Sequence, residues 1–447
     1  MRKLFGTDGV RGVANLDLTP ETVFRLGRAG AYVLSRGKKK CTIVLGKDTR
    51  ISGDLLEGAL ISGICSVGGD VFDIDVVPTP AVAYLTRKLE ASAGVMISAS
   101  HNPIEDNGIK FFSSDGFKLP DEVEKEIENL VFNNSDELPR PTHGDVGRLV
   151  QVRHAGKLYS NYVKEKTNAD LTGLKIVLDC AHGASYKLAP RIFQDLGAET
   201  LVLNHQPNGV NINVNCGSTN MELLKKVVVA SSYDMGIAFD GDADRALAVD
   251  DKGRMIDGDH IMAIFAGHLK TENKLVNNKV VTTVMSNIGL QKALEAEQIE
   301  MLRVKVGDRY VLEEMKKVKA ILGGEQSGHI IMLDYNTTGD GIITAVMLAD
   351  IVRKSAKPLS ELAKVVTKYP QILINVKVKN NTGYETHDEI RKAIEEVESA
   401  LKGKGRLLVR PSGTEPIIRV MAEGPDKDEL EKLARRISKA LEQNLGA

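Results

Sequence analysis

A serine at the end of an apolar run is the first candidate for chemistry. Ser100 lies in the segment Gly94-Val-Met-Ile-Ser-Ala-Ser100-His101-Asn102-Pro103. The apolar part predicts a buried strand, and Pro103 prevents that strand from continuing as a central one. Open α/β sheets place their chemistry at such strand ends. No G-x-S-x-G motif surrounds Ser100, so the sequence gives little support to acyl transfer.

Three aspartates follow a second apolar strand. Asp240, Asp242 and Asp244 come directly after Met235-Gly-Ile-Ala-Phe, and in an extended chain they would point to one face. Carboxylates so close repel one another unless a cation neutralises them. Oxygen ligands suit Mg²⁺ or Ca²⁺, and Mg²⁺ is the usual companion of phosphate. An EF-hand fits poorly, because its sixth position would be Arg245 and its twelfth Asp251. We predict a magnesium site; the alternative is a solvated acidic turn.

Glycine-rich loops follow two further strands. Glu325, Ser327 and His329 alternate after Ala320-Ile-Leu. A carboxylate beside a hydroxyl can hold sugar hydroxyls or an amine, although a polar turn is the alternative.

The segment from Arg410 to Arg419 places two arginines around hydroxyls and a glycine. Arginine binds phosphate bidentately and glycine lets backbone N–H groups approach, so this segment predicts a phosphate cradle; a surface hairpin with ion pairs is the alternative.

The set as a whole indicates phosphoryl transfer. A phosphate ester on Ser100 would carry nearly two negative charges and require a cation beside it. The aspartate-bound metal could supply that charge, and His101 and Lys110 lie close to Ser100 in sequence. Two weaker segments add further groups: Gly307-Asp308-Arg309 after a strand, and Arg11 in the glycine-rich amino terminus.

Composition limits the class of protein. Of 447 residues, 59 are Lys or Arg and 60 are Asp or Glu, so no global field favours nucleic acid or an anionic membrane. The amino terminus lacks the apolar core of a signal peptide, and nowhere do 18 consecutive apolar residues occur. The four cysteines form no CxxC pair, which is typical of free thiols in a reducing compartment. We expect a cytoplasmic protein that binds neither nucleic acid nor membrane.

An internal repeat organises the chain. Three stretches share the order apolar strand, polar turn, amphipathic helix and apolar strand; they begin at Thr42, Lys175 and Val280. Strands that alternate with helices predict βαβ units and a mostly parallel sheet. In each repeat a third strand leads into one of the polar loops. The segment after residue 368 instead predicts a smaller α+β domain.

We therefore predict an α/β protein with three similar α/β domains, whose mixed sheets are mostly parallel, and a smaller C-terminal α+β domain around a central cleft. The predicted domains carry, in order, the serine loop, the metal loop, the sugar-binding loop and the phosphate-binding loop. Their predicted ranges are 1–155, 156–254, 255–368 and 369–447.

Taken together, these motifs make the chain resemble the α-D-phosphohexomutase superfamily. The resemblance rests on five motifs: Phe5-Gly-Thr-Asp-Gly-Val-Arg-Gly12, Ser98-Ala-Ser-His-Asn-Pro103, Asp240-Gly-Asp-Ala-Asp-Arg245, Gly324-Glu-Gln-Ser-Gly-His329 and Arg410-Pro-Ser-Gly-Thr-Glu-Pro416. They occur in the order of the superfamily and span essentially the whole chain. The last two are similar to those of the bacterial phosphoglucosamine mutase branch, whereas phosphomannomutase/phosphoglucomutase relatives tend to carry Met at the Gln326 position and a different phosphate loop.

The resemblance implies a role for each motif. Ser100 would be phosphorylated, and Asp240, Asp242 and Asp244 would hold one Mg²⁺ together with a phosphate oxygen on Ser100. The transfer site would be surrounded by His101, Lys110, Arg11 and His329, with Lys110 or His329 as the acid/base candidate. Substrate binding would fall to Arg245, Gly307, Asp308, Arg309, Glu325, Ser327, Arg410, Ser412, Gly413, Thr414 and Arg419.

The implied reaction interconverts glucosamine 6-phosphate and glucosamine 1-phosphate through a 1,6-bisphosphate, for amino-sugar and cell-wall precursor synthesis. A phosphomannomutase/phosphoglucomutase and a non-catalytic sugar-phosphate sensor are the alternatives. Asp240 as nucleophile is a third, because Phe239-Asp240-Gly-Asp242 is similar to a haloacid-dehalogenase motif. We also expect the fourth domain to act as a mobile lid, and the family suggests a homodimer.

Overall fold

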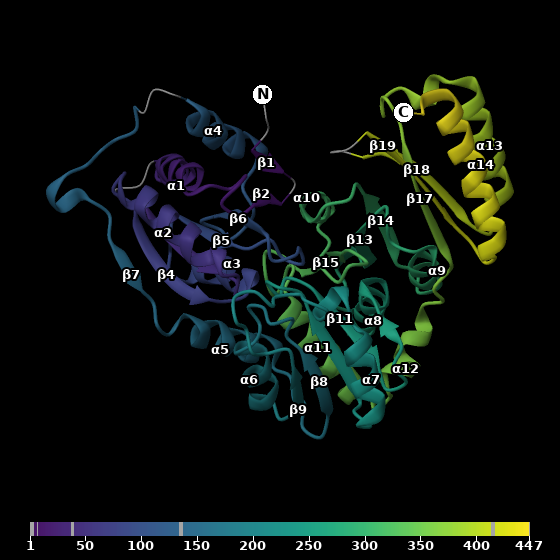
Figure 1. Cartoon of the computed structure of the whole chain (residues 1–447). Coiled ribbons are helices and arrows are strands. Elements are labelled where there is room, and N and C mark those ends of the chain that lie inside the picture. The colour runs from purple at the N-terminus through teal and green to yellow at the C-terminus, as the bar shows by residue number, and fades with distance from the viewer. Residues whose placement is uncertain (1–3, 7, 37–39, 134–136, 413–415, 447) are drawn as a thin grey trace.

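The computed structural model describes residues 4–6, 8–36, 40–133, 137–412 and 416–446. Four sheets follow one another along the described chain (Figure 1). Their strand orders are β1-β2-β6-β5-β3-β4-β7, β12-β11-β10-β8-β9, β14-β13-β15-β16 and β17-β19-β18. We refer to them below as the first to fourth sheets.

The first three sheets share one arrangement of four strands. In the first sheet, β3 (Thr42–Lys47) pairs in parallel with β4 (Asp70–Val76) and β5 (Ala93–Ile97), and β5 pairs antiparallel with β6 (Asp106–Ser113). The second and third sheets repeat these pairings. Their strands are β8 (Lys175–Asp179), β9 (Glu199–Leu203), β10 (Met235–Phe239), β11 (Ala246–Asp250), then β13 (Lys279–Thr283), β14 (Glu300–Val304), β15 (Leu322–Gly324) and β16 (Ile330–Met332). The predicted threefold repeat and fold class are confirmed.

Short strands extend these sheets at their edges. They are β1 (Phe5–Gly6), β2 (Gly9–Val13), β7 (Leu149–Gln151) and β12 (Met255–Ile256). The connecting helices are α1 (Pro20–Leu34), α2 (Ser52–Cys65), α3 (Thr79–Lys88), α4 (Asp121–Phe132), α5 (Ala155–Thr167), α6 (Leu188–Asp195), α7 (Glu222–Ala230), α8 (Gly258–Thr271), α9 (Ile288–Ala296), α10 (Asp308–Val318), α11 (Gly341–Ser355) and α12 (Leu359–Leu362).

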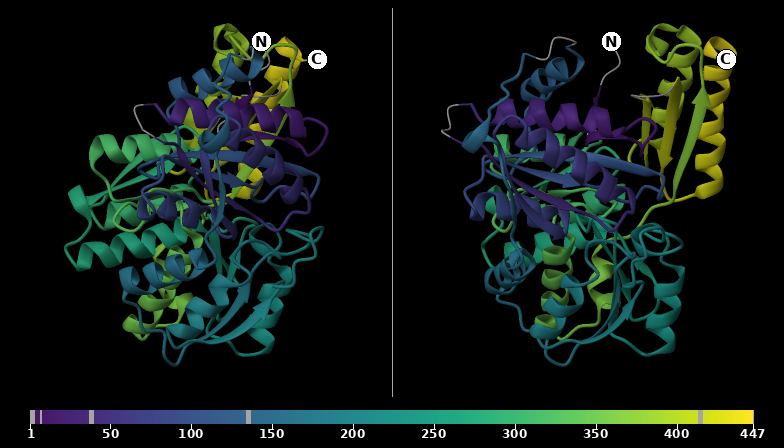
Figure 2. Two further views of the ribbon diagram at one scale, coloured as in Figure 1. Left: turned by 90° about the vertical axis from the view of Figure 1, so that its left-hand side faces the viewer. Right: turned by 60° about the vertical axis from the view of Figure 1, so that its left-hand side comes forward.

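The fourth sheet belongs to a smaller C-terminal unit, Gln371–Leu445. Its strands are β17 (Gln371–Lys377), β18 (Arg406–Pro411) and β19 (Ile417–Glu423), and its helices are α13 (Asp388–Leu401) and α14 (Lys427–Leu445). Both helices cover the outer side of the sheet (Figures 1 and 2). Helix α14 forms because apolar residues recur at helical spacing and Asp426 caps its first N–H groups.

Burial separates this unit from the rest. One continuous core contains residues from each of the first three sheets, among them Val44, Ile237 and Val280. The C-terminal unit has a core of its own, built around Val420, Ile390 and Ile437. Because hydrophobic contact holds the first three sheets together, we expect them to move as one body.

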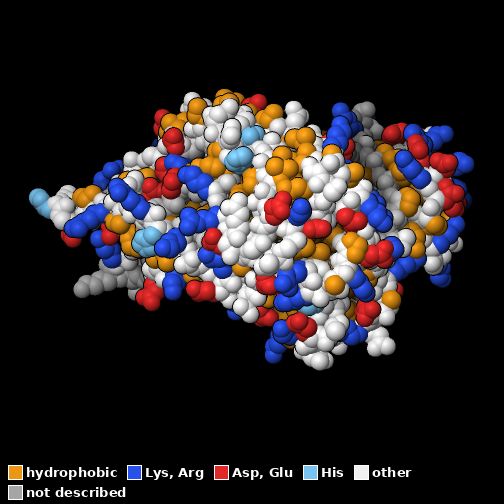
Figure 3. Space-filling model, turned by 90° about the horizontal axis from the view of Figure 1, so that it is seen from below, with side chains coloured by type: hydrophobic (Ala, Val, Ile, Leu, Met, Phe, Trp, Pro, Cys, Tyr) orange, Lys and Arg blue, Asp and Glu red, His pale blue; other side chains and the backbone are white. Residues whose placement is uncertain are grey.

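The surface agrees with the charge balance. Seen from below, basic and acidic side chains are interspersed over the visible face (Figure 3). Within the described residues, no helix combines the length and the apolar character needed to cross a membrane.

Candidate active site

The loop that carries Ser100 is held rigidly at the end of β5. Ser100 is buried and has a left-handed backbone, with φ of 54°, a conformation that is strained for a residue with a side chain. Its N–H donates to Ser98 Oγ at 2.9 Å. Its Oγ lies 2.5 Å from Asp240 Oδ2 and 3.3 Å from His101 Nδ1. The structure thus brings the candidate nucleophile against the candidate metal loop.

A buried arginine fixes the backbone of this loop. Arg50 donates to the carbonyl oxygens of Ser100 (3.1 Å) and Asn102 (2.8 Å), and its Nε pairs with Asp48 at 3.0 Å. Asn213, from the second sheet's unit, donates to the same two carbonyls at 2.9 and 3.1 Å. Five hydrogen bonds, made by the side chains of Ser98, Arg50 and Asn213, therefore position the Ser100 loop before any substrate binds.

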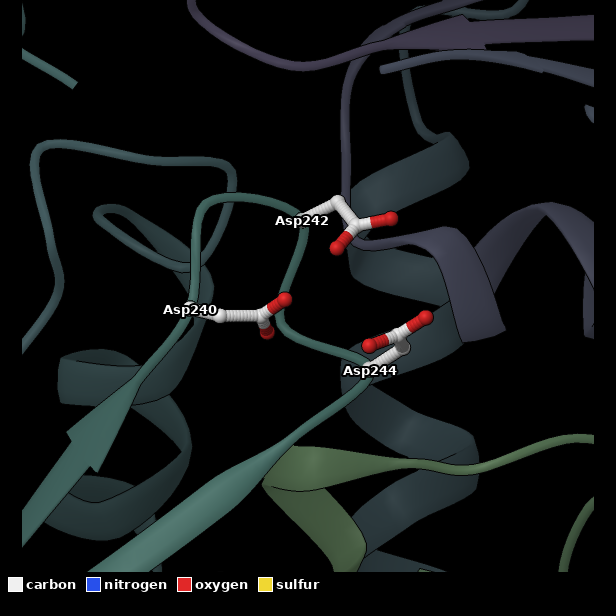
Figure 4. A group of neighbouring side chains, drawn as sticks. All are labelled: Asp240, Asp242 and Asp244. Atoms are coloured by element: carbon white, nitrogen blue, oxygen red, sulfur yellow. The ribbon is translucent and has the colours of Figure 1, made fainter. Parts of the chain in front are cut away.

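The three aspartates converge, but not by the route the sequence predicts. They lie on the loop between β10 and β11, and Ala243 within it has φ of 54°, so the chain turns instead of staying extended. Carboxylate oxygens of Asp240, Asp242 and Asp244 nevertheless lie within 4.8 Å of one another, and their side chains point toward a common space (Figure 4). A tight turn gathers three side chains that would sit farther apart along a strand.

The donor set fits a divalent cation. All three aspartates are buried, and within the described part of the chain Oδ1 of Asp242 and of Asp244 has no hydrogen-bond partner. Burial and the charges of Asp244 and Asp242 raise the pKa of Asp240 well above its ordinary value. Three buried carboxylates, two of them with an orphaned oxygen, are costly unless a cation neutralises them. Oxygen donors of this kind suit Mg²⁺.

Lys110 partly balances this charge. Its Nζ lies 2.8 Å from Asp242 Oδ2 and 3.4 Å from Asp244 Oδ2. Burial alone would lower the pKa of Lys110, but Asp242, Asp8 and Asp244 raise it well above its ordinary value. Lys110 is therefore protonated at neutral pH, which suits a proton donor or charge stabiliser better than a base.

His101 has the opposite tendency. Burial, together with the charges of Arg245 and Arg11, lowers the pKa of His101 to about 4. The ring is thus neutral near pH 7, beside the hydroxyl of Ser100. Arg11 approaches from β2, where its guanidinium contacts Asp8 and donates to Asn102 at 3.4 Å.

His329 reaches the site from the third sheet. Its Nδ1 lies 3.5 Å from Asp244 Oδ1, and its Nε2 lies 3.4 Å from Asp308 Oδ2. Burial would lower the pKa of His329, yet the charges of Asp244, Asp308 and Glu325 raise it to about 9. The imidazolium can therefore donate a proton near neutral pH.

A cavity of about 520 Å³ opens beside these groups, and the sugar-loop residues Glu325, Gln326 and Ser327 line it together with His101 and Arg245. Glu325 Oε1 accepts the N–H of Gly307 at 3.2 Å, and its Oε2 lies 3.4 Å from Ser327 Oγ. The volume is within the range of small-molecule sites.

The predicted phosphate cradle lies in the C-terminal unit. Arg410 and Arg419 stand opposite each other on β18 and β19. Burial and the neighbouring Arg419 lower the pKa of Arg410, and a bound anion would relieve the repulsion. Ser412 bonds through its backbone to Ile417 at 2.8 Å. The predicted residues Gly413 and Thr414 lie outside the described part of the chain.

Arg309 is engaged elsewhere. It contacts Asp121 and donates to Glu124 Oε1 at 2.7 Å, so it joins α10 to α4 across two units. Its role in substrate binding stays a prediction.

Sequence reasoning missed several supporting residues. Lys118 joins Asp8 to Asp308, at 2.5 Å from each, and Thr79 Oγ1 lies 2.5 Å from Asp242 Oδ2. For Asp48 and Arg50 a signal existed, because Gly46-Lys-Asp-Thr-Arg50 is another polar loop at the end of an apolar strand. For Lys118 no pattern distinguishes it from a surface lysine.

Comparisons with known protein families find matches along nearly the whole chain. The four domain families described for phosphoglucomutase/phosphomannomutase match in order: α/β/α domains I, II and III at residues 2–138, 157–253 and 257–369, and the C-terminal domain at 373–440.

Full-length relatives are similar throughout. Phosphoglucosamine mutase of Clostridium novyi (strain NT) is 56% identical over 449 residues, which cover 100% of both chains. That of Desulforamulus reducens is 56% identical over 438 residues, which cover 98% of this chain and 99% of the relative.

Solved structures share the fold. A phosphoglucomutase/phosphomannomutase family protein of Burkholderia thailandensis has a TM-score of 0.83 at 24% identity, covering 100% of this chain and 99% of the other. Aspergillus fumigatus N-acetylphosphoglucosamine mutase, in complex with GlcNAc-6P and magnesium, has a TM-score of 0.71 at 17% identity, with coverage of 98% and 95%.

Proposed function

Because the chain belongs to the phosphoglucomutase/phosphomannomutase family, we propose that it is a phosphohexomutase that interconverts glucosamine 6-phosphate and glucosamine 1-phosphate. The observation that carries this proposal is the 2.5 Å contact between Ser100 Oγ and Asp240, inside a buried trio of carboxylates. Support for the sugar comes from relatives that are 52–56% identical over the full chain and are named phosphoglucosamine mutase.

In the proposed reaction, O1 of glucosamine 6-phosphate attacks a phosphate carried by Ser100. The bond from Ser100 Oγ to phosphorus breaks as the bond from O1 to phosphorus forms, the proton of O1 ends on Ser100 Oγ, and the sugar becomes a 1,6-bisphosphate. This intermediate turns end for end, after which its 6-phosphate returns to Ser100 Oγ and glucosamine 1-phosphate departs. Little covalent chemistry is required of the protein, so positioning and charge stabilisation carry the rate.

The residues present divide this work. Asp240, Asp242 and Asp244 would hold one Mg²⁺. When bound, this ion supplies positive charge to the oxygens of the transferring phosphate. Lys110 and His329 are the proton donors, since the pKa of each is raised. Burial of the site excludes water, which would otherwise hydrolyse the phosphoserine.

Recognition falls to the two remaining loops. Glu325 and Ser327 line the cavity and would bind the sugar ring. Arg410, Ser412 and Arg419 would hold the phosphate that is not being transferred, with Arg fork geometry favouring phosphate. We also propose that hexosamine 1,6-bisphosphate activates the resting enzyme by phosphorylating Ser100.

The test compares kcat/KM for glucosamine, glucose and mannose 6-phosphates under identical Mg²⁺ concentrations. We expect glucosamine 6-phosphate to exceed the other two by at least about tenfold, a factor that corresponds to about 1.4 kcal/mol of transition-state binding. A preference for mannose or glucose phosphate would identify a phosphomannomutase/phosphoglucomutase instead. Absence of turnover on all three would favour a sugar-phosphate sensor.

A further inference from the structure

A chain of buried hydrogen bonds begins at the cavity. Gln326, which lines the cavity between Glu325 and Ser327, donates from its Nε2 to Asp259 Oδ2 at 3.0 Å. Asp259 is buried at the start of α8. The same oxygen accepts the backbone N–H of Asn287 at 2.8 Å. One carboxylate oxygen therefore joins the sugar loop to the residue that caps α9.

Asn287 carries the connection out of the third sheet's unit. Its side chain donates to Glu423 Oε1 and to the carbonyl oxygen of Tyr369, both at 3.0 Å. Its Oδ1 accepts the N–H groups of Gly289 and Tyr369, also at 3.0 Å. Tyr369 lies in the segment that leads into the C-terminal unit, and Glu423 is the last residue of β19. Every polar atom of this buried amide is thus used at the junction.

On the C-terminal side of the junction, the buried polar side chains are also hydrogen-bonded. Glu423 is buried and accepts from Arg406 Nε at 2.9 Å and from Gln371 at 3.0 Å. Arg406 also donates to the carbonyl oxygens of Val284 and Ser286, at 2.9 and 3.0 Å. The loop before α9 is therefore held by two side chains of the fourth sheet. Strands β18 and β19, which supply them, also carry Arg410 and Arg419.

We propose that Asp259, Asn287 and Glu423 are positioning residues that couple Gln326 in the sugar loop to the orientation of the C-terminal unit. This inference rests on the proposed function. The reaction requires the sugar ring and the distal phosphate to be held together, then released together while the bisphosphate turns. In this buried chain Asp259 Oδ2, the Asn287 amide and both carboxylate oxygens of Glu423 are paired. A polar chain paired in this way has few alternative arrangements, so a shift at one end changes the geometry at the other.

The first test needs no catalytic activity. Mass spectrometry measures amide hydrogen exchange of the ligand-free protein in the peptides that contain Asn287 and Tyr369. Gln326→Met removes one hydrogen bond to Asp259 and should speed exchange of these two amides about tenfold, the factor expected for one buried hydrogen bond. Lys292→Met is the matched control: Lys292 donates to Tyr369 Oη at 3.0 Å but stands outside the chain of bonds, and its substitution should leave both amides unchanged.

The second test is kinetic. Gln326→Met and Glu423→Gln should each lower kcat more than they raise KM. Because both substitutions break the same connection, the double variant should be no slower than the slower of the two single variants. Should Glu423→Gln fold poorly, Asn287→Asp breaks the same link while it keeps the acceptor for Gly289 and Tyr369.

Two outcomes would overturn the coupling: exchange rates in Gln326→Met within twofold of the parent, or losses in kcat that multiply in the double variant. A parent enzyme without turnover on any hexose phosphate would refute the proposed function alone, since the exchange experiment still reads the connection between Gln326 and Asn287.

Discussion

Asp242 shows how one side chain can serve two partners. Its Oδ2 is shared by Lys110 and Thr79, while its Oδ1 has no hydrogen-bond partner among the described residues. The carboxylate lies beside those of Asp240 and Asp244 (Figure 4). Because the paired oxygen is already saturated, the orphaned one is the natural metal donor. We therefore expect the two oxygens of this carboxylate to have separate functions.

Asp242→Asn should weaken Mg²⁺ binding strongly. An amide keeps the shape but removes one negative charge from the trio, so we expect the Kd for Mg²⁺, measured by calorimetry, to rise at least about tenfold. Addition of a chelator to the parent enzyme should abolish turnover, and Mg²⁺ should restore it. An unchanged Kd in the variant would show that the trio is not the metal site.

The raised pKa of the buried Asp259 carboxyl should make the stability of the protein depend on pH. Burial, and then the charge of Asp257, raises the pKa of Asp259 to about 7 from an ordinary 3.8. The folded state therefore binds the proton more tightly than the unfolded state, so this residue's contribution is complete below about pH 4 and is lost as pH rises through 7. Between pH 5 and 8 the loss is at most about 3 kcal/mol.

The measurement compares melting temperatures of the parent and Asp259→Asn at pH 5 and pH 8. The parent should lose more stability than the variant, because asparagine does not titrate. Equal losses in both proteins would mean that Asp259 ionises at its ordinary pH.

At the scale of elements, the turn after β10 must approach the Ser100 loop closely. A Cβ at Gly241 would lie 2.4 Å from the carbonyl oxygen of Ser100. The Arg50 and Asn213 side chains hold that carbonyl in place, so it cannot easily move aside. Glycine is required here because two backbones meet.

Gly241→Ala should therefore separate the nucleophile from the metal loop. We expect a loss of about 1–3 kcal/mol in stability from overpacking and a fall in kcat of at least about tenfold. Gly58→Ala is the control: Gly58 lies exposed in α2 with nothing near an added Cβ, so alanine should stabilise the helix slightly. Wild-type turnover in Gly241→Ala would contradict the close approach.

Elements also show what the sequence could predict. Ser100, Asp240 and Glu325 were found because each follows an apolar strand, and strand order brings such loops together in a repeated α/β fold. Arg50 binds carbonyl groups some fifty residues away, and Lys118 meets Asp308 across two units. Such pairings depend on the packing of whole units, which no local pattern encodes. The turn at Ala243 was likewise invisible, since alanine does not signal a positive φ.

At the scale of the whole molecule, we expect the C-terminal unit to be the part that moves. Its core is separate from the core shared by the first three sheets, and polar side chains around Asn287 and Glu423 make its junction. Figure 1 shows it standing next to β14 and α9 of the third unit, across a gap from the first unit. The predicted domain limits near residues 155, 254 and 368, and self-association into a dimer, stay predictions.

Closure of this unit is testable by small-angle scattering. With hexose 1,6-bisphosphate and Mg²⁺, the radius of gyration should fall, because the phosphate draws the Arg410 and Arg419 side chains toward the transfer site. Arg410→Met should reduce the change. Identical scattering with and without the bisphosphate would count against a lid.

The most direct test of the account follows one phosphate. Enzyme labelled with ³²P from a hexose 1,6-bisphosphate should carry acid-stable label on the peptide that contains Ser100, and added glucosamine 6-phosphate should remove it into sugar phosphate. Ser100→Ala should take up no label and lose about 10⁴-fold or more in kcat. Acid-labile label on Asp240, or turnover of Ser100→Ala within tenfold of the parent, would contradict a phosphoserine enzyme.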